Sequence, residues 1–171
     1  MINKAIEKLI NEQINEEMFS AYLYMSMSSW FESQNLPGFA NWMRVQTLEE
    51  MTHADKFYHH LIDRGGRALL KPIKGPDTEW ASPLAVFEAS YKHEQHITSL
   101  INNLVDKALS EKDHAANAML QWFVTEQVEE EKNAEQVIQK LKMMGQAPGG
   151  MFMLDQELGL RVFTPPVVAA T

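Results

Sequence analysis

The sequence predicts an all-α protein: a four-helix bundle with one long crossover between its second and third helices, followed by a short fifth helix. Apolar residues recur at steps of three and four along most of the chain, which is the period of an α-helix. Gly and Pro are concentrated at a few points between these periodic stretches. A chain of 171 residues can bury the core of a single domain without disulfides. The predicted helices span residues 4–35, 38–64, 83–110, 113–144 and 151–161.

Residues that break or cap helices separate these segments. Pro and Gly at 35–38 part the first helix from the second, and the Gly pair at 65–66 ends the second. Ser82 is a favourable N-cap and Pro83 suits the first helical position, so the third helix begins there. A tight turn at 111–113 leads into the fourth helix.

The long connection, residues 65–82, determines the topology. At roughly 3.3 Å per extended residue it can reach about 55 Å, more than the roughly 40 Å length of the predicted second helix. It can therefore run the full bundle, which predicts two antiparallel hairpins joined by one crossover. Gly and Pro at 145–150 precede the fifth helix. We expect the domain to span 1–163 and residues 164–171 to form a loose tail.

Composition excludes several kinds of site and partner. The chain has no Cys, so metal ligands must be nitrogen or oxygen atoms, and iron–sulfur clusters and disulfides are excluded. Its net charge of -8 disfavours nucleic acid and favours cations where acids cluster. The first residues lack the apolar core of a signal peptide, and no stretch has the about 18 apolar residues of a membrane span. We therefore expect a cytoplasmic protein without membrane or nucleic-acid partners.

Polar residues interrupt the apolar stripe of each long helix. The stripe that places Ile10 and Ile14 inside also places Glu17 inside, and the second helix carries a Glu-x-x-His pair on its stripe. At about 1.5 Å per residue, all of these interruptions lie roughly 21 to 29 Å from the tight turns of the two hairpins, and so at one level. They are Glu17, Glu50, His53, Glu94, Gln127 and Glu130.

Buried carboxylates at one level need compensating positive charge, because each unpaired buried charge costs several kcal/mol. Lys and Arg are absent from the stripes near this level, which leaves protons or metal ions. Two divalent cations balance the four glutamates, with His53 as a neutral ligand. Such an oxygen-rich set suits iron or manganese, with zinc as a competitor. Any one of these residues alone is more often a surface residue, but their coincidence on four helices indicates a metal site.

Four segments resemble those of prokaryotic non-haem ferritins, and the resemblance covers nearly the whole chain. They read NEQINEE (11–17), LEEMTHA (48–54), YKHEQ (91–95) and QWFVTEQVEEE (121–131). The resemblance implies a ferritin-like bundle with a ferroxidase centre of two iron ions, which oxidises Fe(II) to Fe(III) with dioxygen or hydrogen peroxide. It also implies iron storage as a ferric mineral in a homo-oligomeric shell of 24 subunits, with the fifth helix at a channel between symmetry mates.

The same resemblance implies the iron ligands. Glu17, Glu50 and His53 would hold the first iron. Glu50 would bridge to a second iron, held by Glu94 and Glu130.

A third iron position is also implied, on Glu49, Glu126, Glu129 and Glu130. The alternative for the run 129–131 is a solvated charged face.

Three more side chains would lie beside the irons. Gln127 would lie next to the second iron, and Tyr24 matches a tyrosine that the family has beside the centre, as a redox neighbour. Trp122 matches a nearby tryptophan, and packing alone is the alternative for both aromatics. We predict no haem, because haem-containing bacterioferritins have a second Glu-x-x-His where this chain has Gln127-x-x-Glu130. Met51, at the position of their haem ligand, is shared by non-haem ferritins.

Two other functions fit the same residues. One is a different di-metal carboxylate oxidase or peroxidase that stores nothing. The other is a non-enzymatic helical bundle that acts in binding or assembly, with its acids protonated or exposed. Particle size and iron loading distinguish these from a storage protein.

Overall fold

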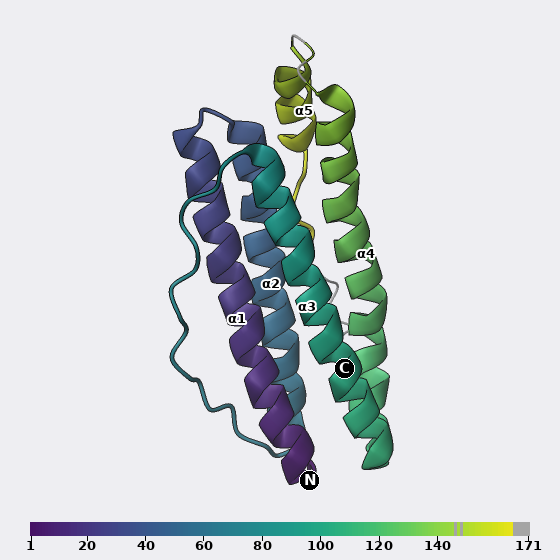
Figure 1. Cartoon of the computed structure of the whole chain (residues 1–171). Coiled ribbons are helices and arrows are strands. Elements are labelled where there is room, and N and C mark those ends of the chain that lie inside the picture. Colours follow the sequence, from purple (N-terminus) through teal and green to yellow (C-terminus); the bar gives the residue numbers. More distant parts are fainter. Residues whose placement is uncertain (146, 148, 166–171) are drawn as a thin grey trace.

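Four long helices pack lengthwise in the computed structural model, which describes residues 1–145, 147 and 149–165 (Figure 1). A short fifth helix lies at one end of the bundle. Among the described helices, none is long and apolar enough to cross a membrane. The predicted all-α bundle is confirmed. The helices are α1 (Lys4–Ser33), α2 (Pro37–Asp63), α3 (Pro83–Ser110), α4 (His114–Met144) and α5 (Gly150–Leu158).

The connection between α2 and α3 runs the length of the bundle, as its reach predicts. It leaves the end where α2 finishes and returns beside α1 to the opposite end, so α3 begins parallel to α2 (Figure 1). Asn11 of α1 holds it in place: Nδ2 of Asn11 donates to the carbonyl oxygen of Arg67 at 3.0 Å, and Oδ1 accepts from the backbone N–H of Leu69 at 2.5 Å. The two hairpins, α1 with α2 and α3 with α4, are thereby joined by one crossover.

Helix ends follow the capping residues closely. The side chains of Ser82 and Asp113 each accept a hydrogen bond from the backbone N–H three residues on, at 3.1 Å in both cases. The first helix ends at Ser33, short of the predicted residue 35. Asn35 adopts a φ of 57°, in the left-handed region that ends a helix and that Asn tolerates.

Helix α5 caps the start of α2. The N-cap residue of α2, Leu36, makes no side-chain cap bond. Asp155 of α5 takes this role, since its Oδ1 accepts from the backbone N–H groups of Gly38 and Phe39 at 2.8 and 3.1 Å. Only glycine permits this approach, because a Cβ on Gly38 would lie 1.7 Å from the carbonyl oxygen of Asp155.

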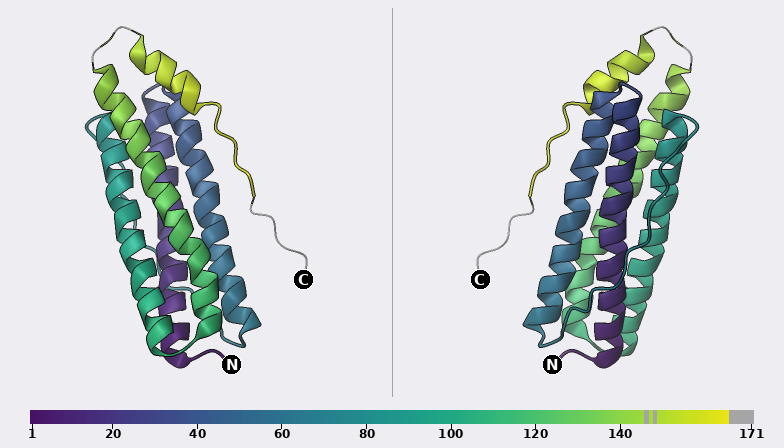
Figure 2. Two further views of the ribbon diagram at one scale, coloured as in Figure 1. Left: turned by 90° about the vertical axis from the view of Figure 1, so that its right-hand side faces the viewer. Right: turned by 90° about the vertical axis from the view of Figure 1, so that its left-hand side faces the viewer.

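The chain beyond α5 departs from the prediction. The fifth helix ends at Leu158 and not at residue 161. The chain then runs along the outside of α2 (Figure 2), where Nδ2 of Asn41 donates to the carbonyl oxygen of Arg161 at 2.9 Å. Of the predicted loose tail, 164–171, residues 166–171 lie outside the described residues.

Two apolar clusters fill the bundle on either side of a polar layer. One lies toward α5 and contains Phe31 and Phe87. The other lies toward the N-terminus and contains Phe57 stacked on Phe123, with ring centroids 4.0 Å apart. These clusters exclude water from both ends of the layer that separates them.

Candidate metal centre

The polar residues that interrupt the apolar stripes come together in the layer between the two clusters. All face the interior, as predicted, and none is more than 3% exposed. Every long helix contributes at least one of them. They are Glu17 of α1, Glu50 and His53 of α2, Glu94 of α3, and Gln127 and Glu130 of α4.

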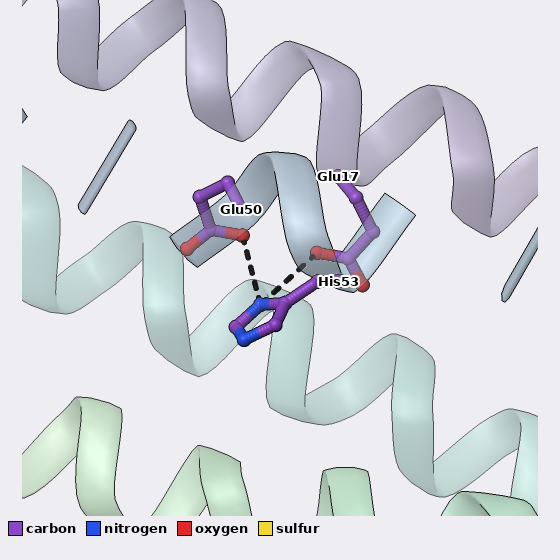
Figure 3. A group of neighbouring side chains, drawn as sticks. All are labelled: Glu17, Glu50 and His53. Atoms are coloured by element: carbon purple, nitrogen blue, oxygen red, sulfur yellow. Dashed lines mark hydrogen bonds and ion pairs between the residues drawn. The ribbon is translucent and has the colours of Figure 1, made fainter. Parts of the chain in front are cut away.

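Glu17, Glu50 and His53 form a group of three potential metal ligands (Figure 3). Nδ1 of His53 lies 3.3 Å from Oε2 of Glu50 and 4.0 Å from Oε2 of Glu17. Oε2 of Glu17 is buried and has no hydrogen-bond partner. A buried carboxylate oxygen without a partner is costly unless a cation or a proton satisfies it. This group therefore fits a metal ion.

Glu94 is held by two hydrogen-bond donors. The Tyr24 hydroxyl donates to Oε1 of Glu94, and Nε2 of Gln127 donates to Oε2 at 3.2 Å. Glu130 accepts a hydrogen bond from Nε2 of Gln46 at 2.8 Å. These donors orient Glu94 and Glu130 toward the layer, although Glu94 belongs to neither of the three-ligand groups found among the described residues.

A second three-ligand group lies on the α4 side of His53. Nε2 of His53 is 3.9 Å from Oε1 of Glu126, and Glu130 completes the group. Of the other residues that the sequence suggests for a third iron, Glu129 is exposed and Glu49 is paired with an arginine. The structure thus brings Glu126 and Glu130 together in one three-ligand group, and Glu129 and Glu49 lie outside that group.

Three residues that hold the carboxylates were not among the predicted site residues. Nε2 of Gln13 donates to Oε1 of Glu17 at 2.8 Å, and the spacing of four residues, one helical turn, is a signal that marks it. Gln46 lies on the apolar stripe of α2, so periodicity marks it too. Arg161, which donates to Oε2 of Glu49 at 2.6 Å, follows α5, where no periodicity applies.

Burial raises the pKa of the layer's carboxyl groups. The pKa of Glu130 rises to about 8, through burial and then the negative charge of Glu94. Burial and the charge of Glu50 hold the pKa of Glu17 well above its ordinary value, and burial followed by Glu94 and Glu130 does the same for Glu50. At neutral pH the metal-free layer therefore retains protons, which a divalent cation must displace.

The two aromatic neighbours have different roles. The pKa of Tyr24 is raised by burial and by the charge of Glu94, so its phenol stays protonated and donates to that carboxylate. Trp122 packs edge-on against His53, with ring centroids 5.6 Å apart, and Lys56 lies 4.2 Å over its ring. Tyr24 touches a candidate ligand through a hydrogen bond, whereas Trp122 supports the imidazole through packing.

Each three-ligand group can hold a divalent cation. Within each group the potential ligand atoms lie within 4.8 Å of one another. His53 faces one group with Nδ1 and the other with Nε2, and as a neutral imidazole it can bind a metal ion through one of these nitrogens at a time. The donors are mostly carboxylate oxygens with one imidazole, which suits iron or manganese. Several of the candidate ligands are oriented by hydrogen bonds, as is usual for metal ligands.

Comparison with known proteins points to one family. A model of the ferritin-like domain matches residues 7–144. The bacterial non-heme ferritin of Bacteroides fragilis strain 638R is 45% identical over 161 residues, which cover 94% of this chain and 100% of that protein. The bacterial non-heme ferritin of Campylobacter jejuni is 40% identical over 156 residues, covering 91% of this chain and 93% of its own.

Solved structures agree with this. The open-pore ferritin of the archaeon Archaeoglobus fulgidus superimposes with a TM-score of 0.93 at 47% identity, covering 95% of this chain and 100% of its own. A humanized archaeal ferritin superimposes with a TM-score of 0.95 at 50% identity, covering 96% of this chain and all of its own.

Proposed function

The chain belongs to the ferritin family, and from this premise we propose that it stores iron. Each subunit oxidises Fe(II) to Fe(III) at a di-iron ferroxidase centre, and the ferric product is kept as a mineral inside a shell of 24 identical subunits. The family membership, the names of the bacterial non-heme ferritins and the fold shared with archaeal ferritins support storage.

The observation that carries the ferroxidase proposal is the group of Glu17, Glu50 and His53. It presents two carboxylates and an imidazole in a buried layer, with Oε2 of Glu17 lacking a hydrogen-bond partner. Glu94 and Glu130 lie close enough for their charges to raise the pKa of Glu50. Glu50 can therefore serve as the bridge, with Glu17 and His53 on one iron and Glu94 and Glu130 on the other.

In the proposed reaction two Fe(II) ions each lose one electron. Dioxygen accepts both electrons and two protons to give hydrogen peroxide, and hydrogen peroxide as acceptor would give two water molecules. Glutamates that held protons in the metal-free layer release them as Fe(II) binds. The protein holds the pair side by side and keeps coordination positions open, after which hydrolysed Fe(III) moves into the shell.

Exposed apolar residues support assembly into a homo-oligomer. On α1, Tyr22 and Met25 are 49% and 45% exposed, and on α2, Met51, Tyr58 and Ile62 are 45%, 42% and 42% exposed. They recur at helical spacing, so each helix presents an apolar strip that would be covered by a neighbouring subunit.

Iron oxidation in a double variant tests the site. Glu50→Ala/His53→Ala removes the bridge and the imidazole, and we expect the initial rate of Fe(II) oxidation to be lost. The matched control is Asp55→Ala/His59→Ala, an acid and a histidine on the same helix whose side chains are 66% and 63% exposed. An unchanged initial rate in the Glu50→Ala/His53→Ala protein would contradict the assignment.

Particle size and iron loading separate storage from its rivals. A storage protein should elute near 24 times 19.6 kDa and retain hundreds of iron atoms per particle after aerobic loading. A small oligomer that oxidises Fe(II) without retaining it would indicate a di-metal oxidase. Absence of bound iron would indicate a non-enzymatic bundle. A third iron ion, the absence of haem and the cytoplasmic location stay predictions.

A further inference from the structure

The segment that follows α5 is fastened to α2 at successive points. We call residues 159–165 the C-terminal strap. Asp155, just before the strap, accepts hydrogen bonds from the first N–H groups of α2. One turn on, Nδ2 of Asn41 donates to the carbonyl oxygen of Arg161 at 2.9 Å. The strap therefore follows α2 toward the metal layer (Figure 2).

Arg161 projects from this strap onto Glu49. Its Nη2 donates to Oε2 of Glu49 at 2.6 Å, and its Nη1 donates to the carbonyl oxygen of Trp42 at 3.4 Å. The guanidinium carbon also lies 4.4 Å over the ring of Trp42. Only 19% of the Arg161 side chain and 23% of the Glu49 side chain are exposed. This pair is more enclosed than an ordinary surface ion pair, and its planar cation is held in one orientation.

Glu49 lies beside the acids of the candidate third iron position. Burial raises the pKa of Glu49; of its charged neighbours, Arg161 acts to lower that pKa, whereas Glu126 and Glu129 act to raise it. A metal ion at this position would share Glu49 with the guanidinium. Two cations on one carboxylate repel each other, and a metal ion that took Oε2 would compete with Nη2 of Arg161 for that oxygen.

We propose that Arg161 is an intramolecular counter-cation that binds Glu49 while the third metal position is empty and is displaced when a divalent cation binds there. Arg161 is thus a positioning residue that acts through Glu49, and the strap sets the affinity of the third position. The inference rests on the proposed function, because it concerns the iron position next to the proposed di-iron pair.

Anaerobic Fe(II) titration of the assembled protein tests this. Arg161→Gln should tighten binding of the third Fe(II) per subunit about tenfold, a factor within the range that a charge-assisted hydrogen bond supplies. Binding of the first two ions should not change. Arg161→Lys, which keeps the charge without the planar fork, should lie in between. In a Glu49→Gln background, Arg161→Gln should have no further effect.

Arg44→Gln is the matched control, since it removes an exposed arginine from α2, the helix that carries Glu49, and changes the net charge equally. An equal change in the control would show a general charge effect and overturn the inference. So would unchanged or weaker third-ion binding in Arg161→Gln, or a third ion missing from both the parent protein and the variant. If the parent protein fails to bind the first two ions, the proposed function fails instead.

A second measurement needs no variant. Amide hydrogen exchange of the strap should become faster when the third equivalent of Fe(II) binds, and should not respond to the first two. Exchange that stays constant while the third ion binds would overturn the displacement of Arg161.

Discussion

Glu49 and Glu50 are neighbours on α2 but face different surroundings. Glu50 is 2% exposed and points into the layer. Among the described residues, His53 is its ion-pair partner. The Glu49 side chain is 23% exposed and points to the flank, where Arg161 pairs with it. Burial and the charges of neighbouring acids raise the pKa of the buried glutamate, which favours its protonated form. The flanking glutamate is neutralised by an arginine from a distant part of the chain.

The difference determines what a metal ion must displace at each position. In the buried group, formed by Glu17, Glu50 and His53, iron would exchange with protons, so its affinity should depend on pH. At the flank, in the proposed third position, iron would exchange with a guanidinium group held by the C-terminal strap, so its affinity should depend on the strap. Glu49 and Glu50 themselves lie on one helix, which makes paired substitutions informative.

Removing each glutamate in turn tests most directly whether Glu49 and Glu50 serve different metal positions. Glu50→Ala should lower the initial rate of Fe(II) oxidation by about 100-fold or more, since even hydrogen-bond partners of metal ligands are worth roughly 10- to 100-fold. Glu49→Ala should leave that rate within about twofold and abolish only the third binding event. Stopped-flow oxidation and anaerobic titration measure the two effects. Equal losses in both variants would show that the two glutamates serve one site.

The second largest effect should be the change of Fe(II) affinity with pH. Because the pKa of Glu130 is raised to about 8, binding that displaces its proton should weaken about tenfold for each pH unit below 8. The same linkage makes the metal-free protein less stable as pH rises from 4.5 toward 8, since the folded state holds a proton that the unfolded state has lost. Titrations and melting curves at pH 6.5 and 8 check both. A pH-independent affinity would mean that no proton is displaced.

A smaller effect should follow from substituting a supporting residue. Gln46→Leu removes the donor to Glu130, and we expect about tenfold weaker binding of the iron pair. Stability should change little, because leucine removes the buried, unpartnered Oε1 of Gln46 but also leaves Oε2 of Glu130 without its donor, and the two effects oppose each other. Gln121→Leu, at an exposed glutamine of α4, is the control. Weaker binding accompanied by a large drop in melting temperature would indicate misfolding instead.

Periodicity was sufficient to predict that the polar residues on the apolar stripes face the interior. The helical period places Glu17, Glu94 and Glu130 on apolar stripes, and the structure confirms their burial. The crossover followed from its length alone. Burial is a local consequence of the pattern within each helix, which is why it can be read from sequence. The role of these residues as iron ligands stays a prediction.

The sequence could not predict contacts between a helix and a segment that has no helical periodicity. Arg161 lies beyond the Gly- and Pro-rich connection after α4, in a stretch where the predicted helix does not continue. Its position depends on the docking of α5 through Asp155 and on the hydrogen bond from Asn41. Neither contact produces a residue spacing in the sequence from which the pairing of residues 161 and 49 could be predicted.

The docking of α5 offers the mildest test of the comparison. In Gly38→Ala the added Cβ would lie 1.7 Å from the carbonyl oxygen of Asp155, so α5 must shift, at a cost of about 1–3 kcal/mol. The strap would loosen without any change to Arg161 or Glu49. The third Fe(II) should then bind a few-fold tighter, and binding of the first two should not change. Gly75→Ala, where a Cβ meets nothing within 4 Å, should leave melting temperature and affinity unaltered. If Gly38→Ala lowers the melting temperature but not the third dissociation constant, Arg161 holds Glu49 independently of the α5 contact.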